Sequence, residues 1–167
     1  MKVILENYCG LIKDNNLKSK FTQKGFGFKK ENNLYIDLFE CLYFLEKKKI
    51  SIVDKNNKII AKEKLENICE KEITDFKNKF LVFKDFTENG YIVKDGTIFG
   101  FDFRIYKKSK SGEHTHTEIV VDVIKTHKTN AITLLKSERL ATTIHTKYIL
   151  AIVDKDQKIH KLKIEKL

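Results

Sequence analysis

The sequence predicts an α+β protein in which a small N-terminal α/β domain (residues 1–85) precedes a mixed-sheet C-terminal domain (residues 86–167). Residues 36–89 place apolar side chains at helical spacing, whereas residues 99–124 alternate apolar and polar side chains as half-buried strands do. The second half also reads as strand–strand–helix–strand–strand. That order is typical of a mixed sheet with a helix packed against it.

In the N-terminal domain we expect a small sheet and two amphipathic helices. Short apolar runs at residues 3–5, 25–28 and 51–53 predict its strands. The predicted buried stripes of the two helices are Leu38, Cys41, Leu42 and Leu45 in the first, and Ala61, Leu65, Ile68 and Cys69 in the second. A helical pattern of phenylalanines continues to residue 89 and links the two domains.

The C-terminal domain is expected to begin with two strands, residues 99–106 and 117–124. In the first strand the predicted inward row is Phe99, Phe101, Phe103 and Ile105, and the outward row is Asp102, Arg104 and Tyr106. In the second strand the predicted inward row is Ile119, Val121 and Val123. Because His116 stands just before the second strand on its outward side, the two strands deliver Tyr106 and His116 to the two ends of one basic loop.

A helix over residues 131–145, a strand over 148–153 and a strand over 159–164 complete the predicted domain. The expected core residues of the helix are Ile132, Leu135 and Leu140, and Arg139 lies near its middle. The run YILAIV is apolar without alternation, which is typical of a central strand covered on both faces. Lysines in the last strand are a usual way to blunt an exposed sheet edge.

Charge and composition limit the class of binding partner and the cellular environment that we expect. The chain has 33 basic and 23 acidic residues and a net charge of +10, which favours a polyanion such as nucleic acid, although a lysine-rich surface gives the same balance. The three cysteines include no C-x-x-C pair and read as reduced thiols. No apolar run approaches the length of a membrane span, and the first residues show no cleavable leader. We therefore expect a soluble, cytoplasmic protein.

Tyr106 and His116 are the first candidates for chemistry. Cleavage of RNA by its own 2′-hydroxyl needs a base on that hydroxyl, an acid on the departing 5′-oxygen and a cation for the phosphorane charge. Histidine suits the acid role, whereas tyrosine, with an ordinary pKa of about 10, needs a cationic environment to act as base. The loop lysines supply one: Lys107, Lys108 and Lys110. The alternative is a strand-end tyrosine and a solvated loop histidine without catalytic roles.

Metal and nucleotide sites have weaker support in the sequence. His114 and His116 form an H-x-H pair, but no third ligand stands at diagnostic spacing. Asp102, Glu118 and Asp122 suggest a metal-dependent nuclease, yet the acidic residue-x-Lys signature is missing around Glu118. The glycines lack the spacing of a phosphate-binding loop. We therefore expect neither a metal nor another cofactor.

Four stretches of the chain resemble the archaeal tRNA-splicing endonuclease (tRNA-intron lyase) family. GYIVKDGTIFGFDFRIY is similar to the family's Gly-Tyr-Val-Val-Lys and Phe-Gly-x-Asp-Phe-Arg-x-Tyr pattern, and HTEIVVDV is similar to its His-Ser-x-x-Leu-Val-x-Val strand. ERLATTIHTKYILAIVD resembles the arginine-bearing helix that runs into an Ala-x-Val-Asp strand. IDLFECLYFLEKKKISIVD resembles the leucine-rich helix and following strand of the family's N-terminal domain. The similarity is collinear from about residue 30.

The resemblance implies a restriction-endonuclease-like C-terminal nuclease domain. It also implies metal-independent cleavage of precursor tRNA at bulge–helix–bulge motifs, leaving 2′,3′-cyclic phosphate and 5′-hydroxyl ends. By the same resemblance Tyr106 is the general base, His116 the general acid, and Arg139 an arginine that sandwiches a bulge base. Asp154 and Asp156 occupy the acidic loop with which the family grips the opposite subunit.

One position departs from the family pattern. Counting back without gaps from residues 151–154 places Thr146 at the family's catalytic lysine and Lys147 beside it. On an extended strand, a shift of one residue turns a side chain to the opposite face. Either a local bulge restores Lys147 to the site, or the subunit has lost its phosphate-stabilising cation.

The family includes two-subunit enzymes, so more than one assembly is open. The chain is expected to form a homodimer or homotetramer, or a heterotetramer with a second endonuclease subunit. In the heterotetramer it could be catalytic or a non-catalytic structural subunit. A third hypothesis is a metal-dependent nuclease or a basic RNA-binding module, which persistent cleavage in EDTA would exclude.

Overall fold

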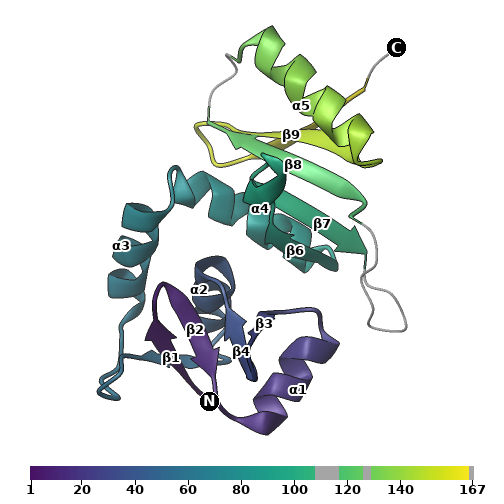
Figure 1. Ribbon diagram of the computed structural model, residues 1–167. Helices are drawn as coiled ribbons and strands as arrows, with labels where there is room; N and C mark the ends of the chain where they lie inside the picture. Colours follow the sequence, from purple (N-terminus) through teal and green to yellow (C-terminus); the bar gives the residue numbers. More distant parts are fainter. Residues whose placement is uncertain (108–116, 126–128, 166–167) are drawn as a thin grey trace. The chain divides into compact units, whose positions relative to one another are not determined.

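The computed structural model describes residues 1–107, 117–125 and 129–165 (Figure 1). The chain separates into two compact units, Met1–Phe76 and Lys77–Leu167, each built on a five-stranded mixed sheet. The boundary predicted after residue 85 falls inside helix α4 (Phe76–Glu88), nearly all of which belongs to the second unit. The protein is therefore a mixed α/β chain with two sheets and five α-helices in its described parts.

The sheet of the first unit has the strand order β3-β4-β2-β1-β5. Its strands are β1 (Lys2–Glu6), β2 (Cys9–Ile12), β3 (Phe28–Lys30), β4 (Asn33–Ile36) and β5 (Ser51–Val53). β5 is parallel to β1, and the other pairs are antiparallel. The strands predicted at residues 3–5 and 51–53 are confirmed. The strand expected at residues 25–28 is wrong, because Gly25 and Gly27 adopt positive φ and β3 begins only at Phe28.

The helices of the first unit are α1 (Asn15–Gln23), α2 (Leu38–Glu46) and α3 (Lys62–Glu72). The predicted stripes are largely confirmed in α2 and α3, where the buried members are Leu38, Cys41, Leu42, Leu65 and Cys69. Ala61 is the exception, because it is the exposed N-cap residue that precedes α3. Helix α1 was not predicted. Only Leu17 and Phe21 of its nine residues are buried, so the sequence shows too short an apolar stripe to reveal the helix.

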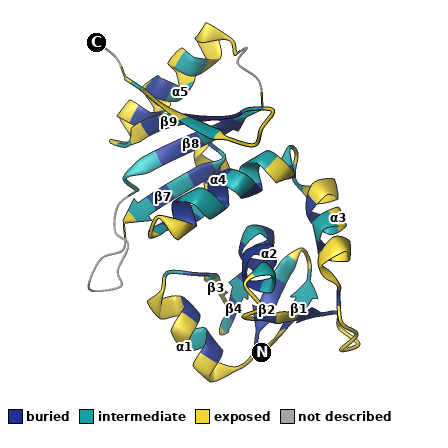
Figure 2. Cartoon of the chain, turned by 180° about the vertical axis from the view of Figure 1, so that it is seen from behind, coloured by how far each residue is buried: buried dark blue, intermediate teal, exposed yellow. Residues whose placement is uncertain are grey.

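The second unit has the strand order β10-β9-β8-β7-β6, with α4 and α5 (Ala131–Thr143) on opposite faces of the sheet (Figures 1 and 2). Its strands are β6 (Tyr91–Asp95), β7 (Phe103–Lys107), β8 (Ile119–Ile124), β9 (Lys147–Val153) and β10 (Ile159–Ile164). β8 and β9 are parallel, and the other pairs are antiparallel. The predicted central strand and lysine-bearing edge strand are thus confirmed as β9 and β10.

Each face of this sheet has its own core. On the α4 face, the ring of Phe83 packs against Phe103 with 6.3 Å between centroids. On the α5 face, Ala141 packs with Val120 and Tyr148. The sheet is therefore covered on both sides, which explains why β8 and β9 are apolar at most positions.

The first strand predicted in this unit begins later than expected. Residues 99–106 were expected to be extended, but β7 starts at Phe103 and Thr97–Phe99 forms a short 3₁₀ helix, η1. Gly96 permits the turn, because a Cβ there would lie only 2.8 Å from a backbone carbonyl oxygen. Phe99 consequently leaves the inward row and is 36% exposed.

Helix α5 packs through a different face from the predicted one. Three side chains expected in its core are instead 61%, 56% and 39% exposed: Ile132, Leu135 and Leu140. Figure 2 shows this outer side of α5 as largely exposed. The buried side holds Ala141 and Glu138, whose carboxylate accepts a hydrogen bond from the Thr142 hydroxyl at 2.9 Å. That bond makes the burial of Glu138 tolerable.

The three cysteines are free, and Cys41 and Cys69 are buried. Burial raises the pKa of the Cys69 thiol to about 12 and the pKa of the Cys41 thiol well above its usual value. Both therefore stay protonated and behave as apolar core residues. None of the helices in the described ranges combines the length and the apolarity that crossing a bilayer would require.

Candidate active site

The ends of three neighbouring strands, β7, β8 and β9, lie side by side at one end of the second sheet. Tyr106 is near the end of β7, Glu118 precedes β8, and Lys147 begins β9. The Glu118 N–H donates to the Ile105 carbonyl at 3.0 Å, and the Lys147 N–H donates to the Glu118 carbonyl at 3.1 Å. The fold thus brings the predicted residues Tyr106 and Lys147 to the same end of the sheet. The predicted residue His116 lies outside the described residues, as do His114, Lys108 and Lys110.

Tyr106 and Lys147 belong to opposite faces of the sheet. Lys147 pairs with Ile119, which pairs with Ile105, the neighbour of Tyr106 in β7. Directly paired residues share a face and successive residues alternate, so Lys147 starts from the α4 face and Tyr106 from the α5 face. The ladder between β8 and β9 is continuous over six residue pairs, beginning at Lys147. Of the two alternatives for Lys147, the local bulge that would turn it toward Tyr106 is not found in this ladder.

Thr146, the residue at the family's lysine position, has a structural partner. Its hydroxyl donates to the Ala141 carbonyl at 3.3 Å, and its backbone N–H donates to the same oxygen at 2.9 Å. These bonds join the end of α5 to the start of β9. A threonine here caps the connection between two elements and supplies no positive charge.

A different cation, Arg104, lies on the same face of the sheet as Tyr106. The guanidinium carbon of Arg104 is 5.9 Å from the centroid of the Tyr106 ring and 5.0 Å from that of the Phe99 ring. Its Nε donates to the Asp95 carbonyl at 2.8 Å, which holds the group in place. Sequence reasoning placed Arg104 and Tyr106 in one row and gave Arg104 no role. Their spacing of two residues was the available signal.

Lys107, the residue that follows Tyr106, forms an ion pair with Glu118. Lys107 Nζ lies 2.9 Å from Glu118 Oε2, and this hydrogen bond raises the pKa of Lys107. The pair is well exposed, so it contributes little to stability. It joins the end of β7 to the start of β8.

Asp102 and Asp122 serve the packing of the unit. Asp102 Oδ1 lies 2.7 Å from Lys79 Nζ, so it connects the sheet to α4. Asp122 accepts hydrogen bonds from the hydroxyls of Tyr148, at 2.9 Å, and Ser137, at 3.2 Å. Burial raises the pKa of Asp122. With Glu118 at the far end of β8, the three carboxylates have separate partners, and no group of three metal-ligating side chains occurs within the described ranges.

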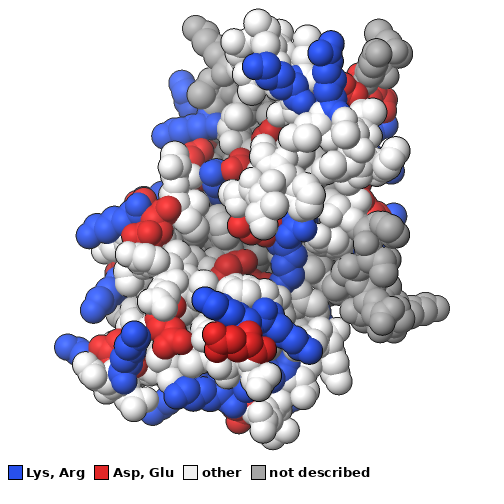
Figure 3. Space-filling view, in the orientation of Figure 1, with Lys and Arg blue, Asp and Glu red and all other residues white. Residues whose placement is uncertain are grey.

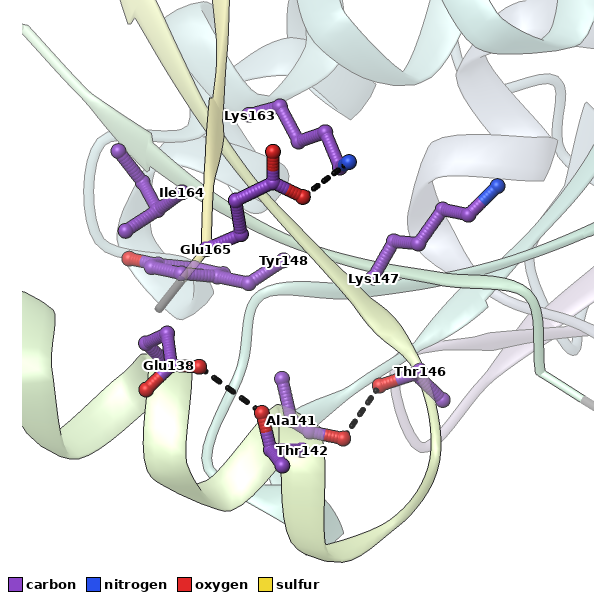
Figure 4. A pocket seen from close by; sticks show the side chains of 9 residues that line it. All are labelled: Glu138, Ala141, Thr142, Thr146, Lys147, Tyr148, Lys163, Ile164 and Glu165. Carbon is purple, nitrogen blue, oxygen red and sulfur yellow. Dashed lines mark hydrogen bonds and ion pairs between the residues drawn. The ribbon is translucent and has the colours of Figure 1, made fainter. Parts of the chain in front are cut away.

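A pocket of about 240 Å³ lies beside Lys147. Its lining comes from the end of α5, β9 and the end of β10: Glu138, Ala141, Thr142, Thr146, Lys147, Tyr148, Lys163, Ile164 and Glu165. In Figure 4 Lys147 and Lys163 extend to one side of the β9 ribbon, whereas Tyr148 and Glu138 lie on the other. Lys163 forms an ion pair with Glu165. The pocket lining therefore includes two acidic residues, Glu138 and Glu165, and two basic residues, Lys147 and Lys163.

Arg139 and the acidic turn lie at the surface of the second unit. Arg139 is exposed on the outer side of α5. In the turn between β9 and β10, Asp154 Oδ1 accepts from the N–H groups of Asp156 and Lys158 at 2.9 Å each, and Oδ2 lies 2.7 Å from His160 Nε2. The hydrogen bond with His160 is the main cause that lowers the pKa of Asp154. Asp154 shapes the turn, and Asp156 is exposed on it.

On the face drawn in Figure 3, basic side chains are not gathered in one patch. Figure 3 shows lysine and arginine of both units interleaved with acidic side chains on the face drawn. The net charge of +10 is therefore a property of the whole chain.

Two family models match the chain. The N-terminal domain of tRNA intron endonuclease matches residues 1–66, and its catalytic C-terminal domain matches residues 76–161. The chain is also similar to proteins named tRNA-splicing endonuclease. It is 28% identical to that of Pyrococcus abyssi, over 99% of this chain and 98% of the relative. It is 32% identical to that of Methanococcus vannielii, over 87% and 82% of the two chains, and 31% identical to that of Methanopyrus kandleri, over 77% and 72%.

Proposed function

The chain belongs to the tRNA intron endonuclease family, and from this premise we propose that it cuts precursor tRNA at bulge–helix–bulge motifs without a metal ion. The products are 2′,3′-cyclic phosphate and 5′-hydroxyl ends. The observation that best supports this reaction is the position of Tyr106, at the end of β7 and beside the start of β8, the strand that His116 precedes.

In the proposed reaction Tyr106 is the general base and His116 the general acid. The phenolic oxygen of Tyr106 takes the proton of the 2′-hydroxyl, and the 2′-oxygen forms a bond to phosphorus. The bond from phosphorus to the 5′-oxygen breaks as His116 donates a proton to that oxygen. Arg104 places a positive charge beside the proposed base, with its guanidinium carbon 5.9 Å from the centroid of the Tyr106 ring.

Lys147 is the proposed source of the cation that stabilises the phosphorane. It begins β9 at the same end of the sheet, and it is exposed. Because its register belongs to the α4 face, its long side chain must extend past the end of the strand to reach a phosphate beside Tyr106.

The remaining parts concern recognition and assembly. We infer that Arg139 stacks on an unpaired bulge base, which its exposed position on α5 allows. We infer a homodimer, a homotetramer or a heterotetramer with a second endonuclease subunit, in which Asp156 contacts the opposite subunit from a turn shaped by Asp154. A restriction-endonuclease-like topology of the second unit and a cytoplasmic location complete the proposal. The alternative is a non-catalytic structural subunit, which the positions of Thr146 and Lys147 favour.

The decisive experiment is cleavage of a labelled bulge–helix–bulge RNA by the purified chain in EDTA. We expect cleavage by the wild type, and a loss of at least roughly a hundredfold in rate for Tyr106→Phe and His116→Ala, because each removes one proton transfer. His145→Asn is the matched control. It replaces another exposed histidine with a residue that tolerates the positive φ at this position, and its rate should equal that of the wild type.

Lys147→Ala in the same assay separates the two roles of the chain. A comparable loss would mean that Lys147 reaches the phosphate, whereas an unchanged rate would mean that another residue supplies the cation. A wild type that cleaves only after a second endonuclease subunit is added, with a rate that His116→Ala leaves unchanged, would establish the structural-subunit alternative. Cleavage that requires magnesium would contradict the proposed mechanism.

A further inference from the structure

An exposed apolar and aromatic surface lies next to Tyr106. It comes from η1, where Ile98 is 85% and Phe99 36% exposed, and from Leu140 of α5, which is 39% exposed. A Cβ added to Gly100 would lie 3.4 Å from Leu140, which shows that η1 and α5 adjoin here. Exposed apolar side chains that adjoin one another beside a candidate site provide a surface on which a ligand can pack.

Arg104 gives this surface a fixed positive charge. Its guanidinium faces the rings of Phe99 and Tyr106, and its Nε is bonded to the Asp95 carbonyl. The Asp95 carboxylate is occupied by the N–H and the hydroxyl of Thr97, at 2.9 Å each. Across the part of the chain that the structure describes, no carboxylate forms an ion pair with Arg104. The charge is thus held between two aromatic rings and is not neutralised there.

The chemistry of this surface matches an unpaired nucleotide. A base can stack on an aromatic ring or a guanidinium plane, and a guanidinium binds the adjoining phosphate. A protein partner would have to bury Arg104 and provide a carboxylate for it, since an unpaired buried charge is costly. The net charge of +10 also favours the polyanion.

We propose that Ile98, Phe99 and Arg104 form a nucleotide-binding strip that holds an unpaired nucleotide of the RNA next to the cleaved phosphate. Phe99 stacks on the base, Arg104 binds its phosphate, and Ile98 covers the outer edge of the base. The strip rests on the proposed function, because its neighbour Tyr106 is the proposed general base. It adds a second site of base recognition to that of Arg139, on a different element.

Equilibrium binding tests the strip without relying on cleavage. The probes are a labelled bulge–helix–bulge RNA and a control RNA of the same length in which the bulges are closed by base pairs. We expect Phe99→Ala to weaken binding of the bulged RNA roughly tenfold and to leave binding of the paired RNA unchanged. Phe28→Ala is the matched control, since it removes another surface phenylalanine, 44% exposed on β3, and should alter neither affinity.

Arg104→Lys keeps the charge and removes the planar group, so it should weaken binding of the bulged RNA while leaving its salt dependence unchanged. Arg104→Gln should also reduce the slope of log affinity against log salt by about 1. Thermal unfolding of each variant verifies that the fold is intact.

Three outcomes would overturn the strip: unchanged affinity in Phe99→Ala, equal weakening for both RNAs, or a changed oligomeric state with unchanged RNA binding. The last outcome would mark a protein interface instead. If the wild type binds the bulged RNA through Phe99 but does not cleave it in EDTA, the strip stands and the proposed catalytic function fails.

Discussion

A single buried carboxylate, that of Glu40, ties two backbone segments of the first unit together. Glu40 is 1% exposed, and both of its oxygens accept from the Gly27 N–H at 3.0 Å. One of them also accepts from the Asp37 N–H at 3.3 Å, which closes the capping box of α2. A buried polar side chain is tolerated here because several hydrogen bonds satisfy its oxygens.

We predict that Glu40→Ala destabilises the protein by about 2–3 kcal/mol, because it removes the carboxylate that accepts from the Gly27 N–H and also removes half of the capping box. Urea unfolding measures this free energy. Glu63→Ala, on the exposed first turn of α3, is the control and should change it by less than about 0.5 kcal/mol. Equal effects of the two variants would contradict this account of Glu40.

At the scale of elements, one turn is used in both units. The sequence pattern IVDK-x-x-K occurs at residues 52–58 and at residues 152–158. In the first, Asp54 Oδ1 accepts from the N–H groups of Asn56 and Lys58, as Asp154 does from the corresponding residues. The shared geometry shows that the leading aspartate is first a turn former. Only Asp154 adds a histidine partner.

We predict that Asp54→Ala and Asp154→Ala each lower the melting temperature at neutral pH, because each removes two acceptor bonds. The pKa of Asp154 is lowered, so its contribution is complete above the ordinary pKa near 3.8 and is lost as the pH falls through the lower folded value. The difference in melting temperature between wild type and Asp154→Ala should therefore narrow below about pH 4. A difference in melting temperature that grows on acidification would contradict the sign of this pKa shift.

RNA cleavage and oligomeric state then distinguish Asp54→Ala from Asp154→Ala, since only the turn of Asp154 is proposed to contact another subunit.

At the scale of the whole molecule, the net charge of +10 acts through many separate side chains. Lysines and arginines spread over a surface attract a phosphate backbone without reading its sequence or shape. Discrimination of a bulged substrate must therefore come from groups that accept unpaired bases, for which Arg139 and the nucleotide-binding strip are proposed.

We predict that affinity for a precursor-like RNA falls at least roughly a hundredfold between about 50 and 200 mM salt, as expected when about four or more phosphates are neutralised. Filter binding or fluorescence anisotropy across salt concentrations measures the slope, and circular dichroism controls for a change of fold. The ratio of affinities for bulged and fully paired RNA should vary much less than either affinity. An affinity that is independent of salt would contradict binding through the phosphate backbone.

Local patterns in the sequence were sufficient for the elements that have one strong signal. The apolar stripes of α2 and α3, the covered strand β9 and the lysine-bearing edge β10 are each determined by the period or composition of a short segment. The pairing of Arg104 and Tyr106 in one row followed from alternation alone. The spacing of apolar side chains is a local property of the sequence. It therefore predicts the buried face of a helix or strand correctly wherever no distant segment favours another face.

The tertiary structure decided what depends on segments far apart in the chain. Helix α5 has apolar residues on two sides, and the close fit of Ala141 against Val120 and Tyr148 selected the side that is buried. The face of Lys147 depends on its register with β8, a pairing between segments 28 residues apart at Ile119 and Lys147. The sequence by itself determined which chemical groups the chain owns and which of them are neighbours along a strand. Only the packing of strands and helices decided the face of Lys147 and the buried side of α5, because strand register and helix burial are set by surfaces that meet only in the folded protein.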